Sequence, residues 1–287
     1  MPWPPTRIEA QLDAALTTST SAVRVRTDAG EAFCKALGGP DEPPSALACD
    51  WIGSRLGQLL GLPVPSVAIC HADLPLVLND AGRTSIPGPA FLSQVVHDAE
   101  TWDGEATSLG QVENPEVIAG GVLLDTWILN HDRYGYRRDG QRRANVRNVL
   151  LQVVGTGRRR RTRLVWLIDH THCLTRRDGD GFATKIDAID HAQDDRLLGL
   201  FPAFVEFATC AQASPWIERL LSIAEADIRT ILTAIPPAWE VETAQRSALL
   251  NLLLRRRDYL LDHWLPTMAA ACAWAQPSTG NLDHEET

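Results

Sequence analysis

The hydrophobic pattern of the N-terminal third predicts several short strands and one long helix. Apolar runs bounded by Gly, Pro and Asp predict extended segments at residues 22–27, 31–37, 63–70 and 91–96. Between them, apolar residues recur at helical spacing over 45–60, and Gly61 is placed to end that helix. A short helix is expected over 7–20. This part of the chain is therefore mainly β with one long helix.

The rest of the chain is mainly helical by the same criterion. Helices are expected at 115–129, about 214–222, about 224–234 and about 241–264. Ser214 followed by Pro215 has the residue order favoured at a helix start, and Pro266 is expected to end the last helix. Two apolar strands, 148–154 and 163–168, are expected to pair around an Arg-rich turn.

These elements predict an α+β fold with two lobes. The small β-rich lobe is expected to span residues 1–97, and the larger helical lobe residues 98–276. The polar residues 277–287 are expected to form a flexible tail.

The composition is that of a protein with a substantial core. The chain has 287 residues, 45% of them hydrophobic, and a formal net charge of −9. Its N-terminus lacks an apolar signal core, and no apolar run reaches the ~18 residues of a membrane span, so no membrane partner is expected. The six Cys residues include no C-x-x-C pair, which favours reduced thiols and a cytoplasmic location. The oligomeric state is left open.

Basic residues are unevenly distributed. Lys occurs only twice, at Lys35 and Lys185, whereas Arg occurs 25 times. The segment 133–163 contains 11 Arg and one acidic residue, a local charge of +10. It is either a solvated basic loop or a surface for a protein substrate that is acidic or associated with nucleic acid.

Three polar residues lie next to apolar runs in the central part of the chain. Asp132 lies just beyond the apolar run 117–129, Asn148 precedes Val-Leu-Leu, and Asp169 follows Leu-Val-Trp-Leu-Ile. Carboxylate, amide and carboxylate in this order suit phosphoryl transfer, in which one Asp orients the acceptor hydroxyl while the Asn and the second Asp hold metal on the phosphates. Each residue alone is compatible with an ordinary structural position, and it is their order that favours catalysis.

The choice of amide rests on its surroundings. Asp132 and Asn148 are 16 residues apart, far more than in the catalytic loop of protein kinases, so the Arg-rich residues between them would have to form an insertion. Asn145 is the competing amide. Asn148 is preferred because the apolar residues after it anchor it at the start of a strand.

Lys35 and Asp50 are candidates for the nucleotide side of the site. Lys35 ends a predicted strand, where its ammonium could contact the α- and β-phosphates. A kinase lysine needs an acidic partner on a helix, and Asp50 in the predicted helix 45–60 offers one, although it is one methylene shorter than Glu. A solvated lysine and a surface aspartate are the alternatives.

Together these sequence segments resemble the HipA-like kinases, especially the small stand-alone members. The matching segments are 33–35, 59–65, 88–93, 125–133, 148–151, 166–170 and 235–239. The resemblance covers about residues 20–265. It implies a divergent protein-kinase/phosphatidylinositol-kinase-like fold, ATP and Mg²⁺ as cofactors, and phosphorylation of Ser or Thr in a protein.

The resemblance also implies roles for individual residues. Lys35 would contact phosphates with Asp50 as its partner, Asp132 would be the catalytic base, and Asn148 and Asp169 would bind metal. Ser19 and Ser21 lie where relatives autophosphorylate, and are candidates for the same modification. The shorter acid, the Arg-rich insertion and the lack of a Gly-rich phosphate loop leave two alternatives: a nucleotide-binding pseudokinase, and a small-molecule or lipid kinase.

Overall fold

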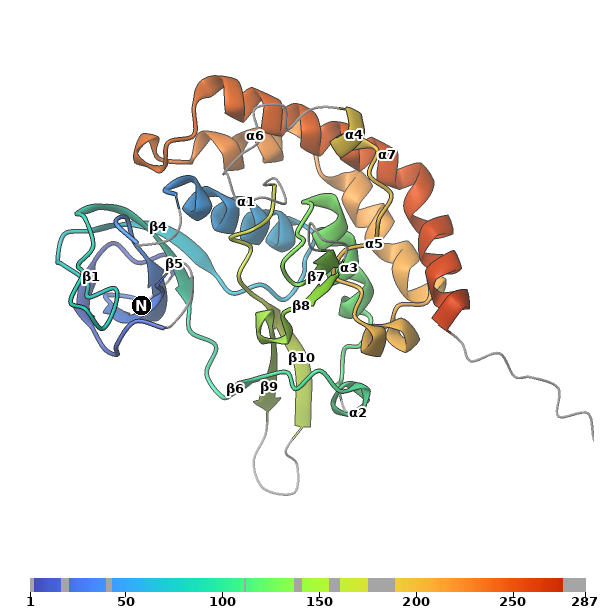
Figure 1. Cartoon of the computed structure of the whole chain (residues 1–287), viewed down its shortest axis with the longest axis horizontal. Coiled ribbons are helices and arrows are strands. Elements are labelled where there is room, and N and C mark those ends of the chain that lie inside the picture. The colour runs from blue at the N-terminus through green and yellow to red at the C-terminus, as the bar shows by residue number, and fades with distance from the viewer. Residues whose placement is uncertain are drawn as a thin grey trace, which may run out of the picture.

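The computed structural model describes residues 3–16, 21–39, 43–110, 112–136, 141–154, 161–174 and 189–275. A curled antiparallel sheet forms the N-terminal part (Figure 1). Its spatial order is β1-β2-β3-β5-β4. Its strands are β1 (Ile8–Gln11), β2 (Val23–Thr27), β3 (Gly30–Lys35), β4 (Val67–Ala72) and β5 (Gly88–Gln94).

The sheet encloses a small apolar core of its own. Alternate residues of β2 and β3 point into it, among them Val23, Val25, Ala32 and Cys34, all fully buried. Register is fixed by direct pairing, with Val23 opposite Cys34 and Val25 opposite Ala32. Burial with period 2 is typical of strands that have one face against a core.

Helix α1 (Ser45–Leu59) joins the sheet to the rest of the molecule. Leu60 caps it and Gly61 follows with φ +74°, the left-handed position in which glycine is favoured. Its buried residues Leu47, Ile52 and Leu56 belong to the same apolar core as the C-terminal helices. The helix therefore packs on both parts of the fold.

The C-terminal part surrounds α3 (Val117–Trp127), all of whose residues are buried. The other helices are α2 (Ala106–Leu109), α4 (Ile189–Ala192), α5 (Cys210–Ser222), α6 (Glu225–Thr233) and α7 (Thr243–Ala275), with 3-10 turns η1 (Val146–Asn148), η3 (Pro202–Phe207) and η4 (Pro237–Trp239). In Figure 1, α7 runs along the outside of this part, beside α5 and α6. None of the described helices combines the length and apolar character needed to cross a bilayer.

The structure has two further small sheets, and in Figure 1 the sheet with β9 and β10 lies below α1, whereas β7 and β8 lie beside α3. One has the order β10-β9-β6 and the other pairs β7 with β8. Their strands are β6 (Ala99–Thr101), β7 (Tyr134–Tyr136), β8 (Arg142–Ala144), β9 (Val149–Val154) and β10 (Arg161–Leu167). The hairpin β7–β8 is formed by the Arg-rich insertion.

The α+β fold predicted from the sequence is confirmed, and several element boundaries need correction. The helix expected within 7–20 is wrong, because Ile8–Gln11 pairs with β2 as strand β1. Helix α5 begins at Cys210 and not at Ser214, since Thr209 and Gln212 form a capping box one turn earlier. The last helix continues past Pro266 to Ala275. The expected tail 277–287 lies outside the described residues, and the lobe boundary near residue 97 stays a prediction.

Candidate functional site

A cavity of about 760 Å³ lies between the curled sheet and the β9–β10 hairpin. Phe33 of β3 and Phe91 of β5 line one side, and Leu150 and Ile168 line another. The connection 94–99, which leads from the first sheet to the second, closes one wall. Lys35, Asp50, Asn148 and Asp169 also line the cavity, so four of the five predicted site residues face the same space.

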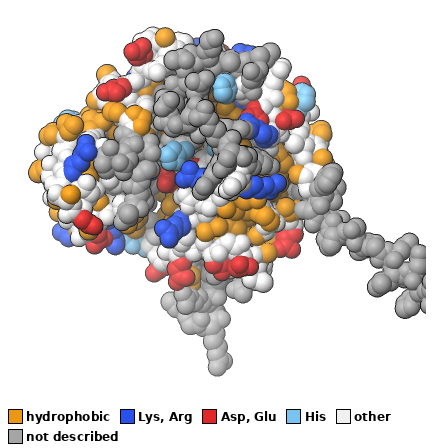
Figure 2. Space-filling model, in the orientation of Figure 1, with side chains coloured by type: hydrophobic (Ala, Val, Ile, Leu, Met, Phe, Trp, Pro, Cys, Tyr) orange, Lys and Arg blue, Asp and Glu red, His pale blue; other side chains and the backbone are white. Residues whose placement is uncertain are grey.

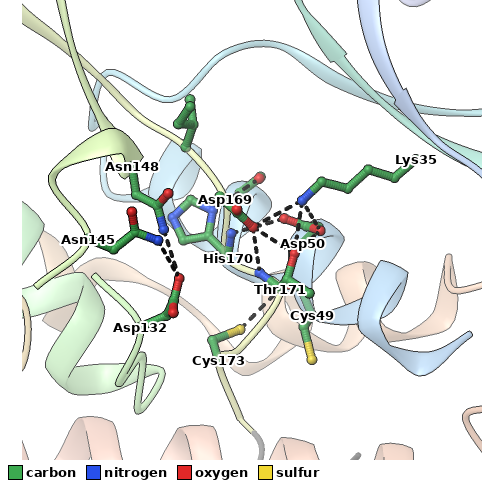
Figure 3. A network of polar contacts seen from close by, with 12 residues as sticks. Lys35, Cys49, Asp50, Asp132, Asn145, Asn148, Asp169, His170, Thr171 and Cys173 are labelled. Carbon is green, nitrogen blue, oxygen red and sulfur yellow. Dashed lines mark hydrogen bonds and ion pairs between the residues drawn. The ribbon is translucent and has the colours of Figure 1, made fainter. Parts of the chain in front are cut away.

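Lys35 is the centre of a buried polar cluster (Figure 3). It ends β3 opposite Phe91 and is only 8% exposed. Its Nζ lies 2.8 Å from Asp50 Oδ2 and 3.0 Å from Asp169 Oδ1, and it donates to Thr171 Oγ1 at 2.8 Å. The structure thus brings together Lys35 and both of its predicted carboxylate neighbours.

The charges in this cluster stabilise one another. Burial alone would lower the pKa of Lys35, but the neighbouring Asp169 and Asp50 outweigh it and raise that pKa. Burial would likewise raise the pKa of Asp169, but Lys35 and the Thr171 hydroxyl lower it below its usual range. Lys35 is therefore a cation and Asp169 an anion throughout the physiological range.

Asp50 reaches Lys35 because α1 lies very close to the segment after β10. Asp50 Oδ1 accepts the backbone N–H of His170 at 2.9 Å, while Oδ2 accepts from Lys35 and Thr171. One turn along α1, a Cβ on Gly53 would lie 2.5 Å from His170 Cβ. This close approach makes an aspartate long enough where a glutamate was expected.

Asp132 lies in the segment between α3 and β7 and is 3% exposed. Its Oδ2 accepts from the side-chain amides of Asn148 at 3.0 Å and Asn145 at 3.1 Å. Within the described part of the chain its buried Oδ1 accepts no hydrogen bond, although Arg143 Nη2 lies 2.5 Å away as an ion pair. Both amides that compete in the sequence therefore contact Asp132, but only Asn148 lines the cavity.

Arg133 connects these segments and was missed from the sequence. Its fully buried guanidinium pairs with Asp125 Oδ2 at 2.7 Å and donates to the carbonyls of Asn148 and Ile168 and to His170 Nε2. It thus ties the end of α3 to the segments that carry Asn148 and Asp169. Its position directly after Asp132 is a sequence signal that could have identified it.

His170 takes part in this network through hydrogen bonds of its ring. Burial and the adjacent Arg133 lower its pKa well below the usual value, so the imidazole is neutral. Nε2 therefore accepts from Arg133, and Nδ1 faces Ser54 Oγ at 3.4 Å.

The donor atoms suit a hard divalent cation. Asn148 and Asp169 offer oxygen, and the Asp169 side chain is 29% exposed at the cavity. Elsewhere in the described residues, no three His, Cys, Asp or Glu side chains form a group that could hold a metal. The oxygen donors of Asn148 and Asp169 therefore favour a Mg²⁺-like ion over zinc.

Of the two autophosphorylation candidates, only Ser21 lies within the described residues. Ser21 is 3% exposed, with φ 49°, just before strand β2. Ser19 lies outside the described residues.

Comparisons with known proteins identify the family of the chain. The sequence matches the family described as HipA-like kinase over residues 18–264. The structure is similar to the Helicobacter pylori proinflammatory kinase CtkA, with TM-score 0.56, 10% identity, and coverage of 95% of this chain and 98% of that one. It also matches the Shewanella oneidensis MR-1 toxin–antitoxin protein HipA, solved with HipB and operator DNA, with TM-score 0.44, 9% identity, and coverage of 91% and 68%. Among curated proteins, none matches the sequence. The chain belongs to the HipA-like kinase family.

Proposed function

We propose that this protein is an ATP- and Mg²⁺-dependent kinase that transfers the γ-phosphate to a Ser or Thr hydroxyl of a protein, its own chain included. The observation that carries the proposal is the Lys35 cluster, in which one ammonium meets carboxylates from α1 and from the segment after β10. A cation held in this way at a cavity is the arrangement that nucleotide kinases need for phosphate binding.

The cavity has the size and lining expected of a nucleotide site. Its volume of about 760 Å³ is within the usual range of ligand pockets. Phe33, Phe91 and Leu150 provide apolar walls for the adenine ring, and Lys35 lies where the α- and β-phosphates would follow.

Asn148 and Asp169 are the residues proposed to hold Mg²⁺. When bound, the ion neutralises the charge of the phosphates. The low pKa of Asp169 keeps its carboxylate ionised, and the ion pair with Lys35 at 3.0 Å holds it in place.

Asp132 is the proposed base. In the transfer, the acceptor oxygen forms a bond to the γ-phosphorus, the bond to the ADP oxygen breaks, and the hydroxyl proton passes to the Asp132 carboxylate. Asn145 and Asn148 hold Oδ2, so the acceptor hydroxyl has to approach Oδ1, which Arg143 contacts as an ion pair.

Asp132→Asn tests the proposal. With ATP and Mg²⁺, wild type should label a protein acceptor, and the variant should lose at least about 100-fold in rate. Nucleotide binding, followed by fluorescence of a labelled ATP analogue, should be retained. Asp80→Asn is the control, because Asp80 is exposed and lies outside the cavity lining. Equal rates for wild type and Asp132→Asn would refute the assignment.

A pseudokinase that acts as an interaction module is the second candidate. The contact between Arg143 and Asp132 favours it, because it places a cation against the proposed base. Transfer of label by wild type, absent in Asp132→Asn, would reject this alternative.

A further inference from the structure

The hairpin β7–β8 presents an arginine to the proposed base. The Arg143 side chain is 44% exposed, whereas the Asp132 side chain is 3% exposed, and Nη2 and Oδ1 are 2.5 Å apart. The contact lacks hydrogen-bond alignment, since Oδ1 has no hydrogen-bond partner among the described residues. Arg143 therefore covers Oδ1 from the solvent side without satisfying it.

This position conflicts with an acceptor hydroxyl. Oδ2 of Asp132 already accepts two amide hydrogen bonds. An acceptor that donates its proton to Asp132 must therefore approach Oδ1, where the Arg143 guanidinium lies. The acceptor and Arg143 compete for the same oxygen, so Arg143 has to move for transfer to occur.

Moving Arg143 breaks its ion pair with Asp132, and the chemistry of the acceptor determines whether a new contact replaces that pair. A neutral acceptor leaves the guanidinium without an anion. An acceptor with a carboxylate beside its hydroxyl provides a new partner, since Arg forms strong, often bidentate contacts with carboxylates. The same contact would hold the acceptor beside Asp132.

The surroundings of Arg143 carry the same charge. Residues 141–154 contain three arginines and no acidic residue. All three, Arg142, Arg143 and Arg147, are exposed, and Arg147 lines the cavity. In Figure 2, basic side chains gather near the middle of the face shown. Without them, the carboxylates Asp132 and Asp169 would repel an acidic acceptor.

We propose that the β7–β8 hairpin is the acceptor-binding surface and that Arg143 selects acidic peptide segments. It would exchange Asp132 for a carboxylate next to the Ser or Thr that is phosphorylated. This inference rests on the proposed kinase function and names the acceptor class for it. It gives the insertion between Asp132 and Asn148 a role in specificity.

The test uses two peptides with one Ser each, flanked by Glu in one and by Gln at the same positions in the other. Wild type is expected to prefer the Glu peptide by about tenfold in kcat/KM. Arg143→Ala should abolish the preference, because the Glu peptide loses its partner while the Gln peptide no longer has to displace an arginine. The Gln peptide should therefore react faster with the variant than with wild type.

Arg142→Ala is the matched control. It removes the same charge from the same hairpin, but the Arg142 guanidinium donates to Tyr134 Oη at 2.9 Å and lies over that ring. It is expected to keep the preference for the Glu peptide. If both variants lost the preference, it would depend on the overall positive charge of the hairpin. That result would overturn a selective role of Arg143.

A binding measurement separates this inference from the kinase proposal. Fluorescence anisotropy of the labelled peptides with ADP present needs no transfer. Preference for the Glu peptide in binding, lost in Arg143→Ala, supports the acceptor surface even if no phosphate is transferred, an outcome that would refute only the kinase proposal. Equal binding of both peptides by wild type overturns the inference. Tighter binding of a duplex DNA of matched charge at about 150 mM salt would assign the hairpin to nucleic acid and also overturn it.

Discussion

Lys35 Nζ and Asp169 Oδ1 lie 3.0 Å apart although the two residues are 134 positions apart in the sequence. The contact joins the end of β3 to the segment after β10, and Asp50 adds a third element, α1. One buried ammonium thus pairs with two carboxylates. This pairing is both a feature of the site and a condition for the stability of the fold.

Lys35→Met should destabilise the protein by about 3–5 kcal/mol at pH 7, because it leaves two buried carboxylates without their cation. In wild type the pKa of Asp169 is lowered, so its contribution to stability is present above its unfolded pKa and is lost as the pH falls through the folded value. In the variant, burial without Lys35 raises the folded pKa of both carboxylates, and protonation relieves the cost. The stability difference should therefore shrink between pH 7 and about pH 4. Urea unfolding at several pH values measures it.

Arg26→Met is the control for this experiment, since Arg26 is an exposed cation on β2. It should change the free energy of unfolding by only about 0.5 kcal/mol, with little pH dependence. A Lys35→Met deficit that stays constant from pH 7 to pH 4 would contradict the buried ion cluster.

The local patterns of the sequence predicted much of the fold. Strands β2 and β3 follow their apolar alternation, and α1 begins and ends near the predicted residues. Elements that depend on partners far away in the sequence were missed. Ile8–Gln11 is a strand only because β2 lies beside it, and β6, three residues long, exists through pairing with β9.

The candidate site was also predicted only in part: the sequence showed residues beside apolar elements but not the contacts between distant segments. Lys35, Asp132, Asn148 and Asp169 each stand at or next to the end of an apolar element, which made them visible in the sequence. Arg133 could have been noticed from its position directly after Asp132, but its contacts could not be predicted. Its partners come from separate segments: Asp125, Asn148, Ile168 and His170. The sequence favoured Asn148 over Asn145 because apolar residues follow Asn148. Both amides reach Asp132, and only Asn148 lines the cavity.

Gly53→Ala should impair the candidate site although Gly53 does not line the cavity. In a free helix the change would stabilise by about 1 kcal/mol, but here the new Cβ would lie 2.5 Å from His170 Cβ. Because His170 follows Asp169 directly, relief of the clash has to move either α1 or the segment that carries Asp169, the residue proposed to bind metal. We expect a lower Tm and a loss of transfer of about tenfold or more.

Gly110→Ala is the matched control. A Cβ there meets its nearest atom at 3.6 Å, an ordinary contact. It should leave both Tm and transfer close to wild type. Full activity in Gly53→Ala would show that the contact between α1 and His170 does not position Asp169.

Asn148→Ala and Asn145→Ala should separate metal binding from the orientation of the base. Both substitutions remove one hydrogen bond to Asp132 Oδ2, at 3.0 and 3.1 Å. Only Asn148 also lines the cavity beside Asp169. Asn148→Ala should therefore lower kcat by about 100-fold and raise the Mg²⁺ concentration needed for half-maximal rate, whereas Asn145→Ala should lower kcat by about tenfold without changing the Mg²⁺ dependence. Rates measured across a Mg²⁺ titration decide the matter. A raised Mg²⁺ requirement in Asn145→Ala alone would transfer the metal-binding role to Asn145.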